Sequence, residues 1–162
     1  MRRALSAALL LVLLAPATVR AHCEIPCGIY GDAMRIEMLR EHVTTIEKAM
    51  NQIDALTAEG DKNYNQIVRW ITNKEQHAVE FQHIVSQYFL HQRIKPAGAD
   101  DSDYVKQLTL LHEMLVHAMK SKQTTETAHT EKLDELISEF SAAYFGPEEL
   151  EHLRDHRLGE SE

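Results

Sequence analysis

Glycine and proline are scarce in this chain of 162 residues, which contains six and four of them respectively. So low a content excludes a collagen-like repeat and argues against a loop-rich β-sandwich or a disordered linker. Glutamate, lysine, glutamine, leucine, alanine and histidine are plentiful instead. The length suits one domain of average size or slightly less. The composition therefore favours helices and excludes a large multidomain enzyme.

Basic clusters are missing beyond the amino terminus. The chain carries 17 basic and 25 acidic residues, for a formal charge of −8. The first 21 residues hold Arg2, Arg3 and Arg20 and no acid, so the remainder has 14 basic residues against 25 acidic ones, or −11. A protein that follows a phosphate backbone needs a basic face, and no run of lysine and arginine longer than a pair occurs downstream. The sequence therefore excludes nucleic acid as a partner.

A membrane-spanning apolar run is also lacking. Residues 4–15 form the longest such run, and about a dozen residues cannot cross a bilayer that needs about 20. The run follows the basic pair Arg2-Arg3 and precedes Val19-Arg20-Ala21, which is typical of a secretory signal cut after a small residue. We therefore predict a signal peptide over residues 1–21 and a mature chain that begins at His22. The protein is expected to be periplasmic or extracellular, with no stable membrane anchor.

Four later stretches repeat apolar residues at steps of three and four, the spacing of one helix face. The first begins at Asp32, a candidate cap, and ends at Gly60; the second begins near Lys62. The third begins near Asp101, and Gly146-Pro147 stops the fourth. Residues 96–101 are predicted as a loop and residues 120–127 as a turn. The expected buried positions are Ile36, Leu39, Val43, Ile46, Met50, Ile53, Leu56, Ile67, Trp70, Ile71, Ala78, Phe81, Ile84, Val85, Tyr88, Tyr104, Leu108, Leu111, Leu115, Ala118, Leu133, Leu136, Ile137, Phe140 and Tyr144. Short connections make an all-α, antiparallel four-helix bundle the expected fold.

Only two cysteines occur, and both lie in the segment His-Cys-Glu-Ile-Pro-Cys-Gly-Ile-Tyr at residues 22–30. A disulfide is the simplest interpretation of a Cys-x-x-x-Cys pair in an exported chain. Cleavage before His22 allows a second interpretation, a metal site, because His22 then offers a free α-amine and an imidazole. Cys23 offers its amide nitrogen and thiolate, and Cys27 a second thiolate. Together these atoms can form a planar N2S2 metal site with an imidazole on its axis.

The donor set narrows the choice of metal. Tetragonal, nitrogen-rich sites suit divalent nickel or copper, whereas zinc prefers a tetrahedron. Copper would threaten to oxidise the thiolates. A deprotonated amide and thiolates stabilise a trivalent state, so they bring the Ni(III)/Ni(II) couple within reach of a mild redox substrate. The segment therefore predicts a one-electron redox catalyst.

The pattern His-Cys-x-x-Pro-Cys-Gly-x-Tyr, followed by a helical domain of this size, closely resembles nickel-containing superoxide dismutase. The resemblance is dense over residues 22–37. It implies that His22 binds nickel through its amine and, in the oxidised state, its imidazole. It implies that Cys23 binds through its amide nitrogen and thiolate, and Cys27 through its thiolate. It further implies one nickel ion per subunit, superoxide as substrate, conversion to O2 and H2O2 by a Ni(III)/Ni(II) ping-pong cycle, and a homohexamer.

The resemblance also implies roles around the metal. Pro26 and Gly28 would shape the turns, and Tyr30 would stand over the open face that superoxide approaches. Glu37 would hold the axial imidazole by a hydrogen bond. Tyr88 is either a second active-site phenol or a packed core tyrosine. Two departures from the family pattern are Glu24, in place of an aspartate, and His77, which aligns with an arginine that helps to orient the imidazole.

These inferences divide the chain into a cleaved signal peptide (1–21), a nickel-binding hook (22–30), a four-helix bundle (31–145) and a charged tail (146–162). Because superoxide is an anion and the mature chain is acidic, a local positive field is expected to guide it. Candidate residues for this field are Arg35, Lys62, Arg69 and Lys74.

Two alternatives remain open at this point. One is an exported helical redox or metal-carrier module with a Cys23–Cys27 disulfide. The other is a di-iron carboxylate bundle, since Glu-x-x-His occurs at Glu80–His83 and at Glu126–His129. That site also needs inward-facing glutamates on the other two helices, which the apolar pattern does not supply. Solvated surface is therefore the preferred interpretation of these motifs.

Overall fold

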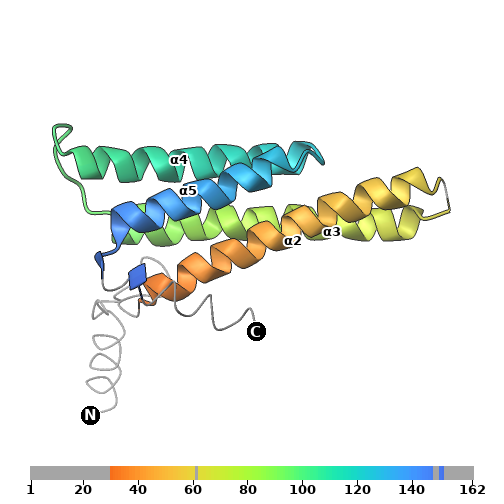
Figure 1. The fold of residues 1–162 in the computed structure, drawn as a ribbon, viewed down its shortest axis with the longest axis horizontal. Coiled ribbons are helices and arrows are strands. Elements are labelled where there is room, and N and C mark those ends of the chain that lie inside the picture. Colours follow the sequence, from red (N-terminus) through yellow and green to blue (C-terminus); the bar gives the residue numbers. More distant parts are fainter. Residues whose placement is uncertain (1–29, 61, 148–149, 152–162) are drawn as a thin grey trace, which may run out of the picture. The chain divides into compact units, whose positions relative to one another are not determined.

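The computed structural model describes residues 30–60, 62–147 and 150–151. The chain divides into two units, Met1–Tyr30 and Gly31–Glu162, and the second unit holds every described helix (Figure 1). The predicted signal peptide and the predicted metal ligands of the hook lie outside the described residues. No described helix is long and apolar enough to cross a membrane.

The second unit is an antiparallel bundle of four long helical segments, which confirms the expected fold class. In chain order the elements are α2 (Asp32–Ala58), α3 (Tyr64–His83), η1 (Ile84–Arg93), α4 (Ser102–Gln123) and α5 (Ala128–Tyr144). Helix α3 continues directly into η1, and the direction reverses at each of the three connections (Figure 1). Helix α2 packs against α3 and α5, while α4 packs against α3 and α5. None of the described residues lies in a β-strand.

The predicted apolar faces meet in the middle of the bundle. Phe89 from η1 stands edge-on to Phe140 and Tyr144 from α5, with ring centroids 5.1 and 5.6 Å apart. Fully buried side chains from every helix surround these rings; they include Ile36, Leu39, Phe81, Leu111, Met114, Leu133 and Ile137. Burial of this apolar surface is the main force that holds the helices together.

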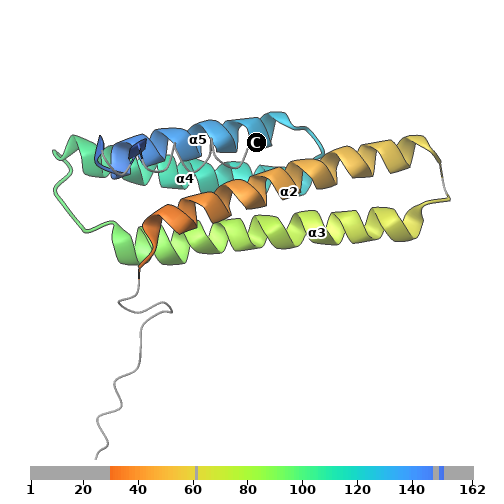
Figure 2. The ribbon, with the colours of Figure 1, turned by 60° about the horizontal axis from the view of Figure 1, so that its bottom comes forward.

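The α2–α3 hairpin extends beyond the end of the α4–α5 hairpin (Figures 1 and 2). Apolar side chains at the start of α3 are consequently exposed, with Tyr64 at 66%, Val68 at 60% and Ile71 at 41%. The expectation that Ile71 is buried is wrong, because no third helix covers this end of the hairpin. Ile67 and Trp70 are half-buried.

Helix α4 is longer than its polar composition suggests. Residues 120–123 were expected to belong to a turn, but α4 continues to Gln123. The ammonium of Lys74 on α3 donates to the carbonyl oxygens of Ser121, Lys122 and Thr124 at 2.8, 2.7 and 3.0 Å. The last carbonyls of a helix have no partner within it, so this cation stabilises the final turn.

The helix ends only partly follow the predicted caps. Asp101 caps α4, close to the predicted start of the third helix, and its carboxylate accepts from the backbone N–H groups of Asp103 and Tyr104 at 3.1 and 2.9 Å. Asp32, however, does not cap α2: it is the first residue of the helix, and the N-cap position is Gly31. The Asp32 side chain is engaged elsewhere, as described below. Helix α5 ends at Tyr144, just before the predicted stop.

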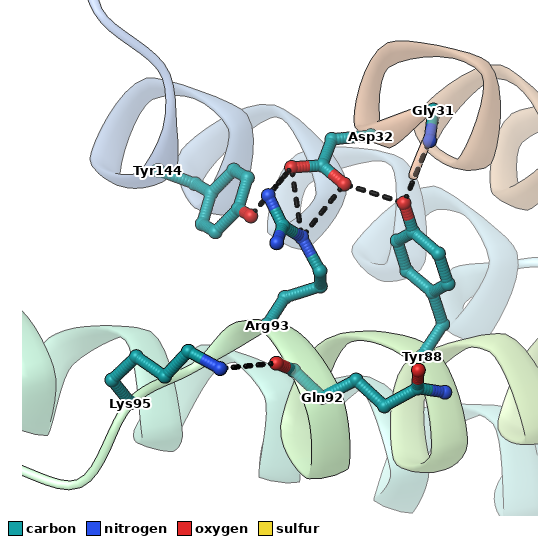
Figure 3. Close-up of polar contacts among 7 residues, drawn as sticks. All are labelled: Gly31, Asp32, Tyr88, Gln92, Arg93, Lys95 and Tyr144. Atoms are coloured by element: carbon teal, nitrogen blue, oxygen red, sulfur yellow. Dashed lines mark hydrogen bonds and ion pairs between the residues drawn. The ribbon is translucent and has the colours of Figure 1, made fainter. Parts of the chain in front are cut away.

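The element η1 is a π-helix, which the apolar spacing did not predict. A π-helix closes hydrogen bonds between residues five apart, as the Ile94 N–H does with the Phe89 carbonyl at 2.9 Å. Residues five apart therefore lie on the same face in successive turns. In η1 this register brings Tyr88 and Arg93 to the side that faces the start of α2 (Figure 3).

Candidate metal centre

The predicted nickel ligands His22, Cys23 and Cys27 lie outside the described residues, so their arrangement stays a prediction. Among residues 30–60, 62–147 and 150–151, no three histidine, cysteine, aspartate or glutamate side chains come together as a metal site would require. Tyr30, the last residue of the predicted hook, is described and is 43% exposed. The residues that follow it in the chain, from Gly31 on, are described.

Asp32 is the centre of a hydrogen-bonded cluster at the start of α2 (Figure 3). Its Oδ1 accepts from the hydroxyl of Tyr88 at 2.5 Å and from Nε of Arg93 at 2.9 Å. Its Oδ2 accepts from the hydroxyl of Tyr144 at 2.7 Å and from Nη2 of Arg93 at 2.6 Å. The carboxylate thus joins α2 to both η1 and α5. We call these four residues the Asp32 cluster.

Charge and burial act in opposite directions on the pKa of Asp32. Burial raises it, but the hydrogen bonds from Arg93, Tyr88 and Tyr144 outweigh burial and leave the pKa below its usual value. The Arg93 pKa is raised, chiefly by the hydrogen bond to Asp32. Because the ion pair is half-buried and forked, it is better defined than an exposed pair on one helix. The carboxylate is therefore ionised at neutral pH.

Tyr88 is packed in the core, as one of the two interpretations from the sequence predicted, and its role as an active-site phenol stays a prediction. Its ring is in the core and only 3% exposed, whereas its hydroxyl lies at the start of α2. That hydroxyl donates to Asp32 and accepts from the backbone N–H of Gly31 at 2.9 Å. Burial and the hydrogen bond to Asp32 raise the pKa of Tyr88 to about 12, so the phenol keeps its proton. The guanidinium of Arg35 lies over the ring, 5.0 Å from its centroid.

Glu37, the expected partner of the axial imidazole, follows Gly31 by less than two turns of α2. Its Oε1 atom is buried and has no hydrogen-bond partner. The side chain lines a groove of about 580 Å³ between α2 and α5, together with Met34, Met38, Arg40, Glu41, Thr44 and Asp134. A buried carboxylate oxygen without a donor is costly in free energy. Glu37 therefore has an acceptor ready for a group that the described residues do not supply.

His77 lies against His42 on the neighbouring helix. Their Nδ1 atoms are 2.9 Å apart, and the rings meet edge to face. Burial and the neighbouring His77 lower the pKa of His42, while Glu80 and Glu41 oppose this shift. His77, which the resemblance aligned with an imidazole-orienting arginine, thus shares a hydrogen bond with a second histidine.

The four candidate steering residues lie in different surroundings. The prediction that Lys74 guides superoxide is wrong, because its side chain is only 4% exposed and its ammonium binds the end of α4. Lys62 and Arg69 are exposed, but they belong to the uncovered end of the α2–α3 hairpin, away from the Asp32 cluster. Arg35 alone is placed beside Tyr88. Arg35 is therefore the strongest of the original candidates.

The Glu-x-x-His motifs do not form an inward-facing pair. Glu80 and His83 are both exposed on α3, and Glu126 is exposed before α5. A di-iron carboxylate site needs such ligands to project into the bundle interior. The preferred interpretation as surface is confirmed for Glu80, His83 and Glu126, whereas His129 is half-buried against the ring of His117.

Sequence reasoning missed Arg93 and Tyr144 as partners of Asp32. Asp32 is 61 positions from Arg93 and 112 from Tyr144, so no local motif joins them. The spacing of five between Tyr88 and Arg93 would place them on different faces of an α-helix. A polar Arg93 beyond the last predicted apolar position was the only available signal.

Comparison with known proteins supports the resemblance found in the hook. Residues 17–147 match the family model for nickel-containing superoxide dismutase, a match that includes the hook and all four long helical segments. No curated protein and no solved structure matches the chain. The chain therefore belongs to the nickel-containing superoxide dismutase family, and it is an oxidoreductase that uses nickel and acts on superoxide.

Proposed function

We propose that this dismutase holds its nickel in the hook, at a site created when the chain is cut after Ala21. The free amine of His22, the amide nitrogen and thiolate of Cys23 and the thiolate of Cys27 would hold the ion. The imidazole of His22 would be a further ligand. We assign one nickel ion to each subunit.

The observation that carries this proposal is the unsatisfied Oε1 atom of Glu37. An imidazole that binds a metal through one nitrogen has an N–H on the other, and a carboxylate is a frequent partner for it. Glu37 follows the hook closely in sequence and presents an acceptor with no donor among the described residues. The donor set fits nickel, because deprotonated amide and thiolate ligands favour a higher oxidation state.

Nickel, when bound, would supply a one-electron couple between its trivalent and divalent states. One superoxide would give up an electron and leave as O2, and a second would take that electron and two protons and leave as H2O2. The protein residues have separate tasks in this scheme. Glu37 orients the imidazole of His22 through its hydrogen bond. Tyr30 stands at the face that superoxide approaches. Arg35 adds positive charge beside Tyr88 and favours an approaching anion.

We further propose that the protein is exported and assembles as a homohexamer. The apolar residues Tyr64, Val68 and Ile71 support assembly, since they are exposed on one end of the α2–α3 hairpin. A cluster of exposed apolar side chains commonly marks a protein interface. Ultracentrifugation should show a hexamer that Val68→Glu weakens, and a monomeric wild-type protein would contradict the assignment.

The position of the mature amino terminus tests the metal site most directly. Protein that begins at His22 should bind nickel and dismutate superoxide. A version with one extra methionine before His22 should lose both properties, because an acylated nitrogen is no longer a primary amine ligand. Nickel is measured by elemental analysis and turnover by pulse radiolysis. Full activity of the extended protein would disprove the hook.

The thiolates provide the second test. Cys23→Ser and Cys27→Ser should each abolish turnover, because each removes a thiolate from the proposed ligands. Helical circular dichroism should remain unchanged, since neither residue belongs to the described bundle core. His22→Gln should retain nickel through the amine but turn over much more slowly. Substantial turnover in either serine variant would contradict thiolate ligation.

A further inference from the structure

The Asp32 cluster holds the point at which the hook joins the bundle. Gly31 and Asp32 directly follow Tyr30, the last hook residue. The Gly31 N–H donates to the Tyr88 hydroxyl, and the Asp32 carboxylate accepts from Tyr88, Arg93 and Tyr144 (Figure 3). The N-cap residue and the first residue of α2 are thereby tied to η1 and α5.

The number of hydrogens that each group can donate determines the direction of the hydrogen bonds in this cluster. Arg93 has only donors, so Asp32 accepts from it as a carboxylate. Tyr88 has one hydroxyl proton, which it donates to Asp32. The Tyr88 oxygen can then only accept from the Gly31 amide, with which it is in contact at 2.9 Å. The orientation of the phenol therefore depends on an ionised and correctly placed Asp32.

Arg93 and Tyr144 hold that carboxylate from two different elements, η1 and α5. Arg93 contacts both oxygens, through Nε at 2.9 Å to Oδ1 and through Nη2 at 2.6 Å to Oδ2. This forked contact defines the plane of the carboxylate as well as its position. Tyr144 donates to Oδ2 from α5. The π-helical register of η1 is essential, because it presents Tyr88 and Arg93 on one face.

We propose that Arg93 and Tyr144 are positioning residues for the hook, which act through Asp32 and Tyr88 on the backbone amide of Gly31. This inference rests on the proposed site in the hook, and it adds residues that contact neither nickel nor superoxide. A short metal-binding segment needs a defined starting point if its ligands are to keep one geometry, since displacements of about 1 Å are costly in catalysis. The Asp32 cluster supplies that starting point.

Deuterium exchange at the Gly31 amide, resolved by fragmentation in the mass spectrometer, tests the cluster in the full mature chain without nickel. Arg93→Met, Tyr144→Phe and Tyr88→Phe should each raise the exchange rate, by about tenfold for Tyr88→Phe, which removes the acceptor. Arg93→Lys keeps the charge without the fork and should restore only part of the protection. Unchanged exchange in Arg93→Met and Tyr144→Phe would overturn the proposal.

A double variant tests whether Arg93 acts through Tyr88. If it does, Arg93→Met combined with Tyr88→Phe should exchange no faster at Gly31 than Tyr88→Phe alone. If the double variant instead multiplied the increases in exchange rate of the two single variants, Arg93 would act independently of Tyr88, and the proposal would be wrong. Ile46→Val is the matched control, because this fully buried residue lies on α2 four turns from Asp32. It should lower global stability without a specific effect at Gly31.

The nickel-loaded protein gives the second readout. Arg93→Met and Tyr144→Phe should retain nickel but show a broadened electron paramagnetic resonance spectrum in the oxidised state, which reports several ligand geometries instead of one. Ile46→Val should give the wild-type spectrum. A wild-type spectrum in Arg93→Met would contradict the positioning role.

The two tests also separate this inference from the proposed ligand set. Cys23→Ser should leave Gly31 exchange unchanged in the nickel-free chain, even though it destroys the metal site. Failure of the serine variants to lose nickel would disprove the hook ligands, while the Gly31 result would still decide the role of Arg93. Normal Gly31 exchange in Arg93→Met would disprove the positioning role of Arg93 and would leave the proposed hook ligands unaffected.

Discussion

His42 and His77 face each other across α2 and α3 with their Nδ1 atoms 2.9 Å apart. At this distance only one proton can lie between the two nitrogens, so at least one ring accepts. Glu41 and Glu80 are the acidic groups that influence His42, and both act against the lowering of its pKa by burial and by His77. The pair is therefore a titratable contact between the first two helices.

We expect this pair to make the bundle less stable in mild acid. The pKa of folded His42 lies below the unfolded value of about 6.5, so the unfolded chain binds more protons below that pH. The unfolding free energy should be level above about pH 7 and should fall as the pH drops through about 6.5 towards the folded pKa. Urea unfolding across this range measures the change.

His117 should also lower the unfolding free energy in mild acid, because burial lowers its pKa as it does for His42. The diagnostic quantity is therefore the difference between wild type and His42→Gln, which should lose part of the pH dependence. His83→Gln, at an exposed position on α3, is the matched control and should behave as wild type. An identical pH dependence in His42→Gln would remove the pair as its source.

Glu37→Gln should slow turnover while nickel remains bound. The amide keeps the size of the carboxylate but not its charge, so it holds an imidazole N–H less strongly. Loss of such a partner typically costs about 10–100-fold in activity. Glu41→Gln is the matched control, because Glu41 lies one turn further along α2 and lines the same groove. Equal losses in both variants would point to the charge of the groove instead of a specific contact.

Lys74→Met should destabilise the bundle by about 2 kcal/mol or more, because three carbonyls at the end of α4 lose a charged donor. The measurement is chemical denaturation of the mature chain. Lys122→Met is the control: it removes a more exposed ammonium that pairs with Glu75 at 3.6 Å, for an expected cost below about 1 kcal/mol. Similar costs for the two variants would show that the carbonyl contacts add little.

Arg35→Gln should lower kcat/KM for superoxide and weaken its dependence on salt. If Arg35 supplies a local attractive field, wild-type kcat/KM should fall as ionic strength rises from about 0.01 to 0.15 M and the screening length shrinks from roughly 30 to 8 Å. Arg69→Gln removes an exposed charge at the far end of the hairpin and should have a smaller effect. A wild-type rate that rises with salt would show that the net negative charge governs the approach.

The sequence alone determined two features of this protein. The predicted metal ligands of the hook are contiguous in the chain, so their identity and spacing can be recognised without any tertiary contact, and the family match agrees with that recognition. The bundle was also predictable, since each helix repeats its apolar residues at helical spacing. Ile36, Leu39, Phe81 and Leu133 are buried as that spacing predicted.

The tertiary structure decided which residues hold the start of α2. Asp32 reads as a helix cap in sequence, yet its carboxylate binds Arg93 and Tyr144, which only the folded bundle brings near. The π-helical register of η1 became visible only in the structure, because apolar periodicity does not distinguish it from an α-helix over so few turns. Lys74 changes from a presumed surface charge to a buried donor for the same reason. These roles arise from contacts between distant segments, and a local pattern carries no information about which segments meet.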